Sequence, residues 1–413
     1  MSMNKETIVC GLDLGVYRLK ACLARVDHVH APEIVGISQV ATRGIRKSSI
    51  SDLQDVSDGI NRILNGLKEK SKLDFKDVHI GLGGHFIQHR KTHAIIPLAD
   101  KGNKVITTFD IKKINHQACL LGINLDEKLI HDFPVQYVVD GFNMAANPLG
   151  LHGRKLEANI LIAVAQSNLI NNVHKAVQQA GFDVKTVAFS SLRSADACLA
   201  DDDKKRGCIF IDMGVEATSV LIFKEGVLKN LGILNYGSNQ LTEEISRKLN
   251  LPFDLAEDIK RSYAMVLTGD DSAMIKGEIL VKRDASYVTI DRQSVCQVVT
   301  PWAMTLVEKI HQLVRQADLE HHLCAGIFVV GGGALLSGLL ESMEQKFSVP
   351  TKVAKIQIET KQLNNPAVYA GCIGLAVQRA TDGLPVPFSQ VYKQGSMLHK
   401  VTYRLKELYQ EYF

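Results

Sequence analysis

Two aspartates with matching surroundings stand about half a chain length apart. Asp13 and Asp212 each end a short apolar run, and each is followed two positions later by a glycine, Gly15 or Gly214. In a β-hairpin, an Asp-x-Gly turn presents a carboxylate and backbone N–H groups to one small volume. Two such turns facing each other can hold a polyphosphate and its magnesium ion. The sequence therefore predicts a duplicated nucleotide-binding chain in which both aspartates contact magnesium through water.

A run of three glycines adds a third feature of the same kind. Gly331, Gly332 and Gly333 follow an apolar run and precede a helical pattern, which would allow the backbone to approach a nucleotide closely. Taken alone, such a turn is often only structural. The chain has no GxxxxGK[ST] motif, which excludes a P-loop NTPase, and no GxGxxG helix start, which leaves a Rossmann enzyme unsupported.

Strand-like and helical runs alternate along the chain, which indicates an α/β architecture. A buried strand is predicted at residues 78–84, ending in glycines, and a small β-rich unit at 274–299. Residues 201–206 are interpreted as a solvated surface turn. Helices are predicted at residues 52–70, 111–122, 169–181, 237–249, 254–263, 302–316, 335–347 and 371–380.

Composition limits the class of protein. A chain of 413 residues predicts two domains or more. The net charge of +4 is small and the basic residues are dispersed, so no nucleic-acid partner is expected. The 8 cysteines form no CxxC pair and are interpreted as reduced core residues. Neither a signal-peptide core nor a bilayer-spanning stretch is evident, and the body is expected to be cytoplasmic.

The order of these motifs resembles a known arrangement. The chain has an order of motifs similar to the actin–hexokinase–Hsp70 order: two Asp-x-Gly hairpins, then Ala256-Glu257-Asp258-Ile259-Lys260, then the glycine turn. Within that group the chain resembles the bacterial cell-division family FtsA. Residues 326–339 resemble the family's adenosine motif, and residues 135–141 and 147–153 resemble its inserted subdomain. The arginine that usually follows the position of Pro301 is Trp302 here.

The resemblance covers nearly the whole chain and implies an actin-like (ribonuclease H-like) fold. This is a two-lobed α/β fold with two five-stranded sheets, small inserted subdomains and a C-terminal amphipathic helix. The implied division is lobe 1 at residues 1–84, 160–206 and 370–382, inserted subdomain 1C at 85–159, lobe 2 at 207–245 and 300–369, subdomain 2B at 246–299, a linker at 383–397 and a membrane-targeting helix at 398–413.

The resemblance also implies ATP and magnesium as ligands. The residues expected to bind the nucleotide are Asp13, Gly15, Val16, Arg18, Asp212, Gly214, Gly237, Glu257, Lys260, Gly331, Gly332 and Gly333. No catalytic residue is assigned.

Both phosphate turns depart from the family pattern. Val16 replaces a Thr or Ser, and Val215-Glu216-Ala217 replaces Gly-Gly-Thr. A carboxylate about 4 Å from a phosphate would cost on the order of 4 kcal/mol at a near-surface dielectric. One hypothesis is therefore weakened ATP binding with slow or absent hydrolysis. A repacked turn that binds ATP normally is an equally open alternative.

The C-terminal segment predicts an amphipathic helix behind a linker that contains proline and glycine. In the FtsA family the corresponding tail is the membrane anchor, whereas the alternative is a terminal helix packed on its own domain. The residues expected at an anionic membrane surface are Leu398, Val401, Arg404, Leu405, Lys406, Leu408, Tyr409, Tyr412 and Phe413.

As the resemblance implies, the protein would self-assemble into actin-like filaments on the cytoplasmic face of the inner membrane at mid-cell. It would bind the FtsZ C-terminal tail through subdomain 2B, with Arg292 at a family basic position, and recruit other division proteins. Three rivals share the fold: a sugar or metabolite kinase, a pilus-assembly adaptor of the PilM type and a filament of the MreB type.

Three histidines at a spacing of four suggest a second kind of site. His85, His89 and His93 are compatible with a metal centre, but on an alternating strand they share one face. No acidic or thiol partner stands nearby in the sequence, and a solvated strand face is the favoured interpretation.

Overall fold

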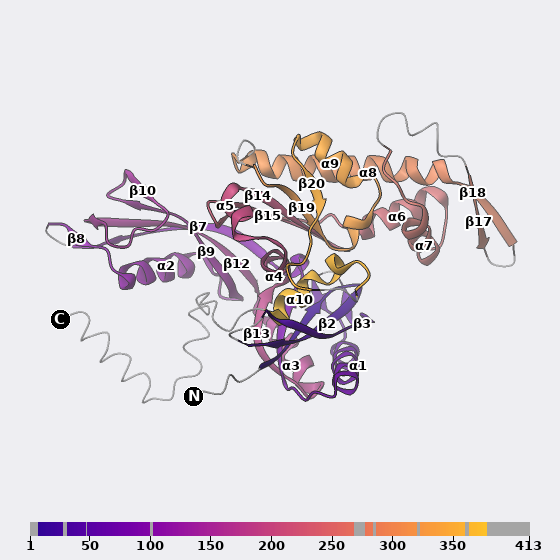
Figure 1. Cartoon of the computed structure of the whole chain (residues 1–413), viewed down its shortest axis with the longest axis horizontal. Coiled ribbons are helices and arrows are strands. Elements are labelled where there is room, and N and C mark those ends of the chain that lie inside the picture. The colour runs from indigo at the N-terminus through magenta and orange to yellow at the C-terminus, as the bar shows by residue number, and fades with distance from the viewer. Residues whose placement is uncertain are drawn as a thin grey trace. The chain divides into compact units, whose positions relative to one another are not determined.

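The computed structural model describes residues 7–27, 31–46, 48–99, 102–267, 277–283, 286–319, 323–359 and 363–377. The chain divides into two compact units (Figure 1). One contains Met1–His89 with Ala165–Gln378, and the other contains Arg90–Val164. The predicted linker and the predicted amphipathic helix lie outside the described residues.

The first sheet of the larger unit has five strands in the order β13-β6-β1-β2-β3. The hairpin of β1 and β2 is antiparallel, as is the pair of β2 and β3, whereas β6 runs parallel to β1 and β13 runs parallel to β6. The strands are β1 Thr7–Leu14, β2 Arg18–Val26, β3 Glu33–Ala41, β6 Asp77–Leu82 and β13 Asp183–Phe189.

The second sheet repeats this plan in the order β16-β15-β14-β19-β20. Strands β14, β15 and β16 are antiparallel, and β19 and β20 continue the sheet in parallel. The strands are β14 Cys208–Met213, β15 Thr218–Lys224, β16 Val227–Leu234, β19 Gly326–Val330 and β20 Thr351–Val353. The predicted duplication, with two five-stranded sheets, is confirmed.

Amphipathic helices cover these sheets because their apolar faces need burial. In α1 (Leu53–Ser71), Asp52 caps the N-terminus by accepting from the Asp55 amide at 3.0 Å, and Ile60, Ile63 and Leu64 are buried. The other helices of this unit are α3 Ser167–Gln179, α4 Ser190–Cys198, α5 Asp201–Arg206, α6 Ser238–Leu249, α7 Phe253–Tyr263, α8 Arg292–Gln316, α9 Leu339–Phe347 and α10 Ala370–Val377, with single 3-10 turns at Gly84–Phe86, Gly332–Leu335 and Pro366–Tyr369.

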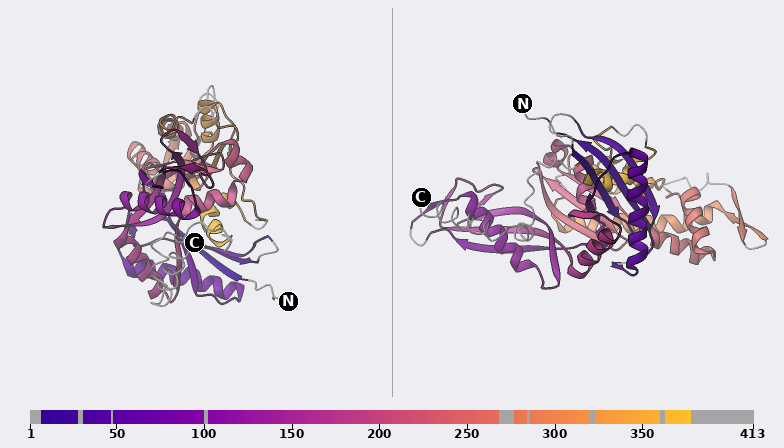
Figure 2. Two further views of the ribbon diagram at one scale, coloured as in Figure 1. Left: turned by 90° about the vertical axis from the view of Figure 1, so that its left-hand side faces the viewer. Right: turned by 90° about the horizontal axis from the view of Figure 1, so that it is seen from below.

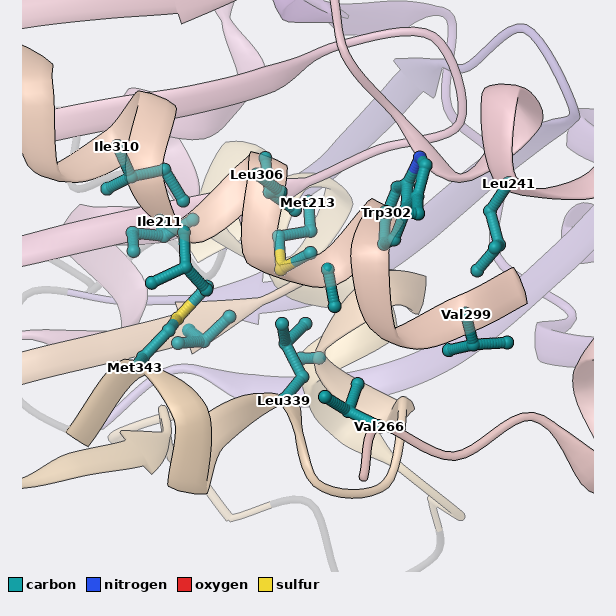
Figure 3. Close-up of a cluster of buried hydrophobic side chains, with 14 of the residues drawn as sticks. Ile211, Met213, Leu241, Val266, Val299, Trp302, Leu306, Ile310, Leu339 and Met343 are labelled. Carbon is teal, nitrogen blue, oxygen red and sulfur yellow. The ribbon is translucent and has the colours of Figure 1, made fainter. Parts of the chain in front are cut away.

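Packing against the second sheet explains why α8 begins well before Pro301. Val299, Trp302 and Leu306 of α8 pack in one buried cluster with Ile211 and other apolar side chains (Figure 3). The prediction of a β-rich unit up to residue 299 and of a helix starting at Trp302 is wrong, because α8 begins at Arg292 and contains Pro301. Proline usually marks a helix boundary, but burial on both sides of it carries the helix through.

Three shorter segments also differ from or complete the predicted elements. Residues 201–206 form the short exposed helix α5 rather than a turn. Helix α9 starts at Leu339 rather than 335, because Gly338 adopts a φ of +78° at the helix boundary. Strands β17 (Glu278–Arg283) and β18 (Ser286–Asp291) pair as a hairpin, and β4 (Ile45–Arg46) pairs with β5 (Ser49–Ile50).

The smaller unit has a four-stranded sheet in the order β10-β9-β12-β7 and one long helix, α2 (Thr108–Gly122), seen in purple in Figure 2. Thr107 and Asp110 form a capping box at the start of α2, and Ile114 joins the apolar core of this unit. The strands are β7 Gln88–Pro97, β8 Lys104–Val105, β9 Glu127–Val139, β10 Asn143–Ala145, β11 His152–Gly153 and β12 Lys155–Gln166.

Two general features concern the described residues of both units. None of the described helices is both long and apolar enough to cross a bilayer. The cysteines are free, and all are buried except Cys324, which is exposed.

Candidate functional site: a cavity between two aspartate hairpins

A cavity of about 580 Å³ lies in the larger unit and is lined by both Asp-x-Gly hairpins. Its volume is in the range of small-molecule sites in proteins. Gly237 is absent from its lining and instead packs behind the second turn, where an added Cβ would lie 2.2 Å from the Val215 carbonyl oxygen. The predicted residues that do line the cavity are Asp13, Gly15, Val16, Arg18, Asp212, Gly214, Glu257, Lys260, Gly331, Gly332 and Gly333.

Two consecutive serines join the two halves of this site. Ser190 Oγ donates to Asp13 Oδ1 at 2.5 Å, and Ser191 Oγ donates to Asp212 Oδ2 at 2.8 Å. Both serines begin helix α4, which follows strand β13 of the first sheet. One short segment therefore contacts the aspartate of each hairpin, and both turns line the same cavity.

The electrostatics of the two carboxylates are similar but unequal. Burial raises the pKa of Asp13, while Lys20 and the Ser190 hydroxyl oppose that rise. Burial also raises the pKa of Asp212; the Ser191 hydroxyl and, to a smaller extent, Lys20 oppose this, but the nearby charge of Asp13 raises the pKa of Asp212 further. Lys20 is held in place because its Nζ donates to the Val368 carbonyl at 2.8 Å.

The oxygen donors in the cavity suit magnesium better than a metal that needs all of its ligands from the protein. Carboxylate and hydroxyl oxygens are hard ligands, and magnesium commonly takes one or two carboxylates together with waters and substrate phosphates. Within the described part of the chain, no group of three or more His, Cys, Asp or Glu side chains is placed to hold an ion. Asp13 and Asp212 are thus the residues that would hold magnesium alongside a polyphosphate.

The two turns are braced by different partners. In the first, Thr42 Oγ1 donates to the Gly15 carbonyl at 2.7 Å and the Thr42 amide donates to the Tyr17 carbonyl at 3.0 Å. In the second, the amides of Ser238 and Asn239 at the start of α6 donate to the carbonyls of Gly214 and Val215 at 3.1 and 2.9 Å. The first amides of α6 therefore hold the second turn.

The glycine turn after β19 is needed for packing and also borders the cavity. Gly331 has a φ of +87°, and a Cβ there would lie 2.4 Å from the Met213 carbonyl oxygen and 2.9 Å from Asp212 Oδ1. A Cβ on Gly333 would lie 2.8 Å from that of Met213, whereas Gly332 has no neighbour within 4 Å. Two of the three glycines let the turn approach the second hairpin, and the middle one faces open space.

Helix α7 supplies a charged network to the cavity wall. Glu257 Oε2 accepts from Lys260 Nζ and from Thr242 Oγ1, each at 2.6 Å, and Glu257 Oε1 accepts from Arg261 Nε at 2.8 Å. Although burial raises it, these hydrogen bonds hold the pKa of Glu257 below its usual value. The Arg261 guanidinium also lies over the Tyr17 ring at 5.0 Å and so links α7 to the first hairpin.

Several cavity residues were missed by the sequence analysis. Ser190 and Ser191 carry no motif, although their place after a buried strand could have suggested them. His85 lines the cavity, its Nε2 is buried with no hydrogen-bond partner among the described residues, and burial lowers its pKa to about 4. Lys20 and Trp302 also line the cavity.

The remaining predicted positions lie elsewhere. Arg292 is the first residue of α8 and is not part of the cavity lining. His85 belongs to a 3-10 turn rather than to a strand. No acidic residue stands near the histidines in the sequence, but in the folded sheet Glu157 Oε2 on β12 lies 3.3 Å from His93 Nε2. That neighbour is far away in the sequence and adjacent only in the folded sheet.

Comparison with known proteins gives two family matches. A model described as "Cell division protein FtsA" matches residues 209–374, and one described as "SHS2 domain inserted in FTSA" matches residues 84–164. FtsA of Pseudomonas aeruginosa is 26% identical over 419 residues and covers 100% of both chains. FtsA of Escherichia coli is 24% identical over 356 residues, which cover 84% of this chain and 83% of that protein.

Solved structures agree on the fold. A chain of the PilM–PilN type IV pilus biogenesis complex matches with a TM-score of 0.64 and 16% identity, covering 89% of this chain and 97% of that one. MreB5 of Spiroplasma citri bound to ADP matches with a TM-score of 0.50 and 13% identity, covering 88% and 94%. The actin-like fold is confirmed, and the chain belongs to the FtsA family of cell-division proteins.

Proposed function

We propose that this protein binds magnesium-ATP in the cavity between its two aspartate hairpins and acts as a membrane-associated adaptor for FtsZ. The observation that carries the nucleotide proposal is the pair of hydrogen bonds from Ser190 and Ser191 to Asp13 and Asp212. The ADP complex of MreB5, which shares the fold, supports it.

In this proposal the phosphates and magnesium lie by the two carboxylates. Arg18 and Lys20 line the same cavity and supply positive charge, while Glu216 places a carboxylate on its wall. Magnesium would supply the charge that lets a triphosphate approach Asp13 and Asp212. The sugar and base would lie by Glu257, Lys260 and the glycine turn. Hydrolysis is expected to be slow or absent, because the second turn lacks the glycines and hydroxyl usual in the family.

The adaptor role rests on family membership and on the sequence of the tail. The segment 398–413 would hold the protein on the cytoplasmic face of the membrane at the division site, with affinity for anionic lipid. Residues 246–299, with Arg292, would take the FtsZ C-terminal tail, and filaments would form by self-assembly. ATP would favour assembly if it binds the assembling conformation more tightly. A pilus adaptor is the second candidate, because the PilM–PilN complex shares the fold.

Calorimetric titration of the full chain with magnesium-ATP tests the nucleotide proposal. The unaltered protein should bind, and Asp212→Asn should weaken binding about 100-fold or more, because a phosphate-linked metal loses a charged ligand. Asp58→Asn, an exposed carboxylate on α1, is the matched control and should bind as the unaltered protein does. Absence of binding by the unaltered protein would refute the proposal.

Sedimentation with vesicles tests the adaptor proposal. The full chain should recruit a labelled FtsZ tail peptide to vesicles that contain anionic lipid, and a chain ending at Gly395 should not reach the vesicles. Arg292→Glu should reach the vesicles but recruit less peptide. Vesicle binding without any peptide recruitment would favour the pilus-adaptor alternative.

A further inference from the structure

One polar atom on the cavity wall has no partner within the described protein. Trp302, on α8, lines the cavity and is only 5% exposed, and its Nε1 is buried without a hydrogen-bond partner among the described residues. Buried N–H groups are nearly always paired, because an unpaired one loses its bond to water and gains nothing. The indole N–H therefore needs an acceptor that the described residues do not provide.

The indole is held in one orientation. The Tyr236 ring stacks on it with centroids 5.3 Å apart and planes 17° from parallel, and Tyr236 Oη donates to the Trp302 carbonyl at 3.3 Å. Val299 and Leu306 of the same helix belong with Trp302 to one apolar cluster. In Figure 3 the indole nitrogen lies at the edge of the ring away from Val299. A donor fixed in this way loses little freedom when a ligand binds.

We propose that the Trp302 indole N–H donates a hydrogen bond to the nucleoside part of a nucleotide bound in this cavity. The inference rests on the nucleotide site proposed above. Purine ring nitrogens and ribose oxygens are neutral acceptors, which suit a neutral donor embedded in an apolar cluster. Arg18 and Lys20, which line the same cavity, would be the charged partners of the phosphates. Trp302 is thus a binding residue for the nucleoside and not for the polyphosphate.

The composition of the chain provides a direct readout, because Trp302 is the one tryptophan in its sequence. A full-length sample labelled with nitrogen-15 therefore has a single indole N–H resonance. Titration with magnesium-ATP, with adenosine and with magnesium-triphosphate should move the indole proton downfield for ATP and adenosine but not for triphosphate. A resonance that moves with triphosphate alone, or that stays in place when ATP binds, would overturn the proposal.

Trp302→Phe gives a second test, because it keeps an aromatic ring and removes the N–H. ATP affinity should fall about 3- to 10-fold, the range expected for one neutral hydrogen bond, while triphosphate affinity stays unchanged. Thermal unfolding without ligand checks that the variant is folded. Equal ATP affinity of the variant and the unaltered chain would refute the role of Trp302 while leaving nucleotide binding intact. Failure of the unaltered chain to bind ATP would refute both proposals.

Discussion

The two sheets of the larger unit share a strand plan but differ in the chemistry of their turns. In each, an aspartate near the end of the first strand pairs with the neighbouring parallel strand, Asp13 with Gly81 and Asp212 with Val330. The first turn continues with Val16 and a cationic Arg18, whereas the second carries the acidic Glu216. Strand order thus fixes where the carboxylates lie, and the turn residues are free to vary around them.

The glycines after the parallel strands show the same contrast. Gly331, just after β19, approaches backbone, whereas an added Cβ on Gly84, after β6, would meet the Ser219 hydroxyl at 2.4 Å. A hydroxyl at the end of a side chain can rotate away, but a carbonyl in a strand end cannot. Both contacts lie on the second hairpin, and the glycine turn after β19 is therefore expected to tolerate less change than the one after β6.

Alanine substitutions should reveal this difference with the largest effect on stability. Gly331→Ala must adopt a φ of +87° and displace the Met213 carbonyl, so it should lower the free energy of unfolding by about 3 kcal/mol or more. Gly84→Ala should cost clearly less, and Gly332→Ala least, because Gly332 has open space around it. Urea denaturation of the three variants measures the order, and equal losses would contradict it.

The parallel strand next to each hairpin differs in one titratable residue, a histidine on β6 that β19 lacks. His79 of β6 pairs with Gly11, where the second sheet pairs Phe328 with Phe210. Burial and Lys185 lower the pKa of His79 to about 4; Asp77 opposes this and Arg193 adds to it. The unfolded chain takes up a proton as the pH falls from about 6.5 to 4, and the folded chain does not. Stability present above pH 6.5 should therefore fall through this window, by up to about 3 kcal/mol.

His79→Gln should remove that contribution, since glutamine can still bond Thr186, whose Oγ1 lies 2.8 Å from His79 Nδ1. Other titrating groups, including His85 and the two cavity aspartates, are common to both proteins and cancel in the difference. Denaturant unfolding at a series of pH values gives the two slopes. Parallel slopes between pH 4 and 6.5 would show that His79 takes up its proton over the same pH range in the folded and the unfolded chain.

The turn chemistry predicts a smaller effect on ligand affinity. Glu216→Gln removes a carboxylate from the cavity wall and should strengthen magnesium-ATP binding about 10-fold, because a nearby phosphate is no longer repelled. Glu225→Gln, at the β15–β16 turn of the same sheet, makes the same charge change outside the cavity lining and should leave affinity unchanged. Calorimetry measures both, and an unaltered affinity for Glu216→Gln would favour the repacked-turn alternative.

The smallest effect concerns the carboxylates without ligand. Burial and the charge of Asp13 raise the pKa of Asp212, so the ionised side chain destabilises the folded state. Asp212→Asn keeps an acceptor for Ser191 and should stabilise the ligand-free protein by about 1 kcal/mol. Asp13→Asn should stabilise it less, because Lys20 and Ser190 both oppose the effect of burial on Asp13, whereas Asp212 has the charge of Asp13 added to burial. Thermal unfolding compares the two variants, and destabilisation by Asp212→Asn would contradict the stated electrostatics.

Sequence patterns predicted the duplicated plan because each Asp-x-Gly hairpin is local. The strand, the turn and its glycine lie within one short segment, so their geometry follows from nearby residues. Ser190 and Ser191 could not be assigned in this way, because their partners Asp13 and Asp212 are brought to them only by the sheets. The start of α8 was misplaced for a related reason, since burial in the core overrides the local preference of Pro301.

The sequence also shows no sign of polar contacts that form only when remote segments come together. Trp302 reads as a core residue in a helical stripe, and only the packing of Tyr236 and the cavity beside it single out the indole nitrogen. Glu157 on β12 contacts His93 on β7, and these two neighbouring strands are far apart in the sequence. Residue patterns along the sequence do not predict contacts between remote segments.

Diffraction from crystals grown with magnesium and a slowly hydrolysed ATP analogue tests the central claim most directly. We predict triphosphate density between the two hairpins, with magnesium and its waters contacting both Asp13 and Asp212. A nucleotide held by one hairpin alone, or bound outside the cavity, would contradict the shared site.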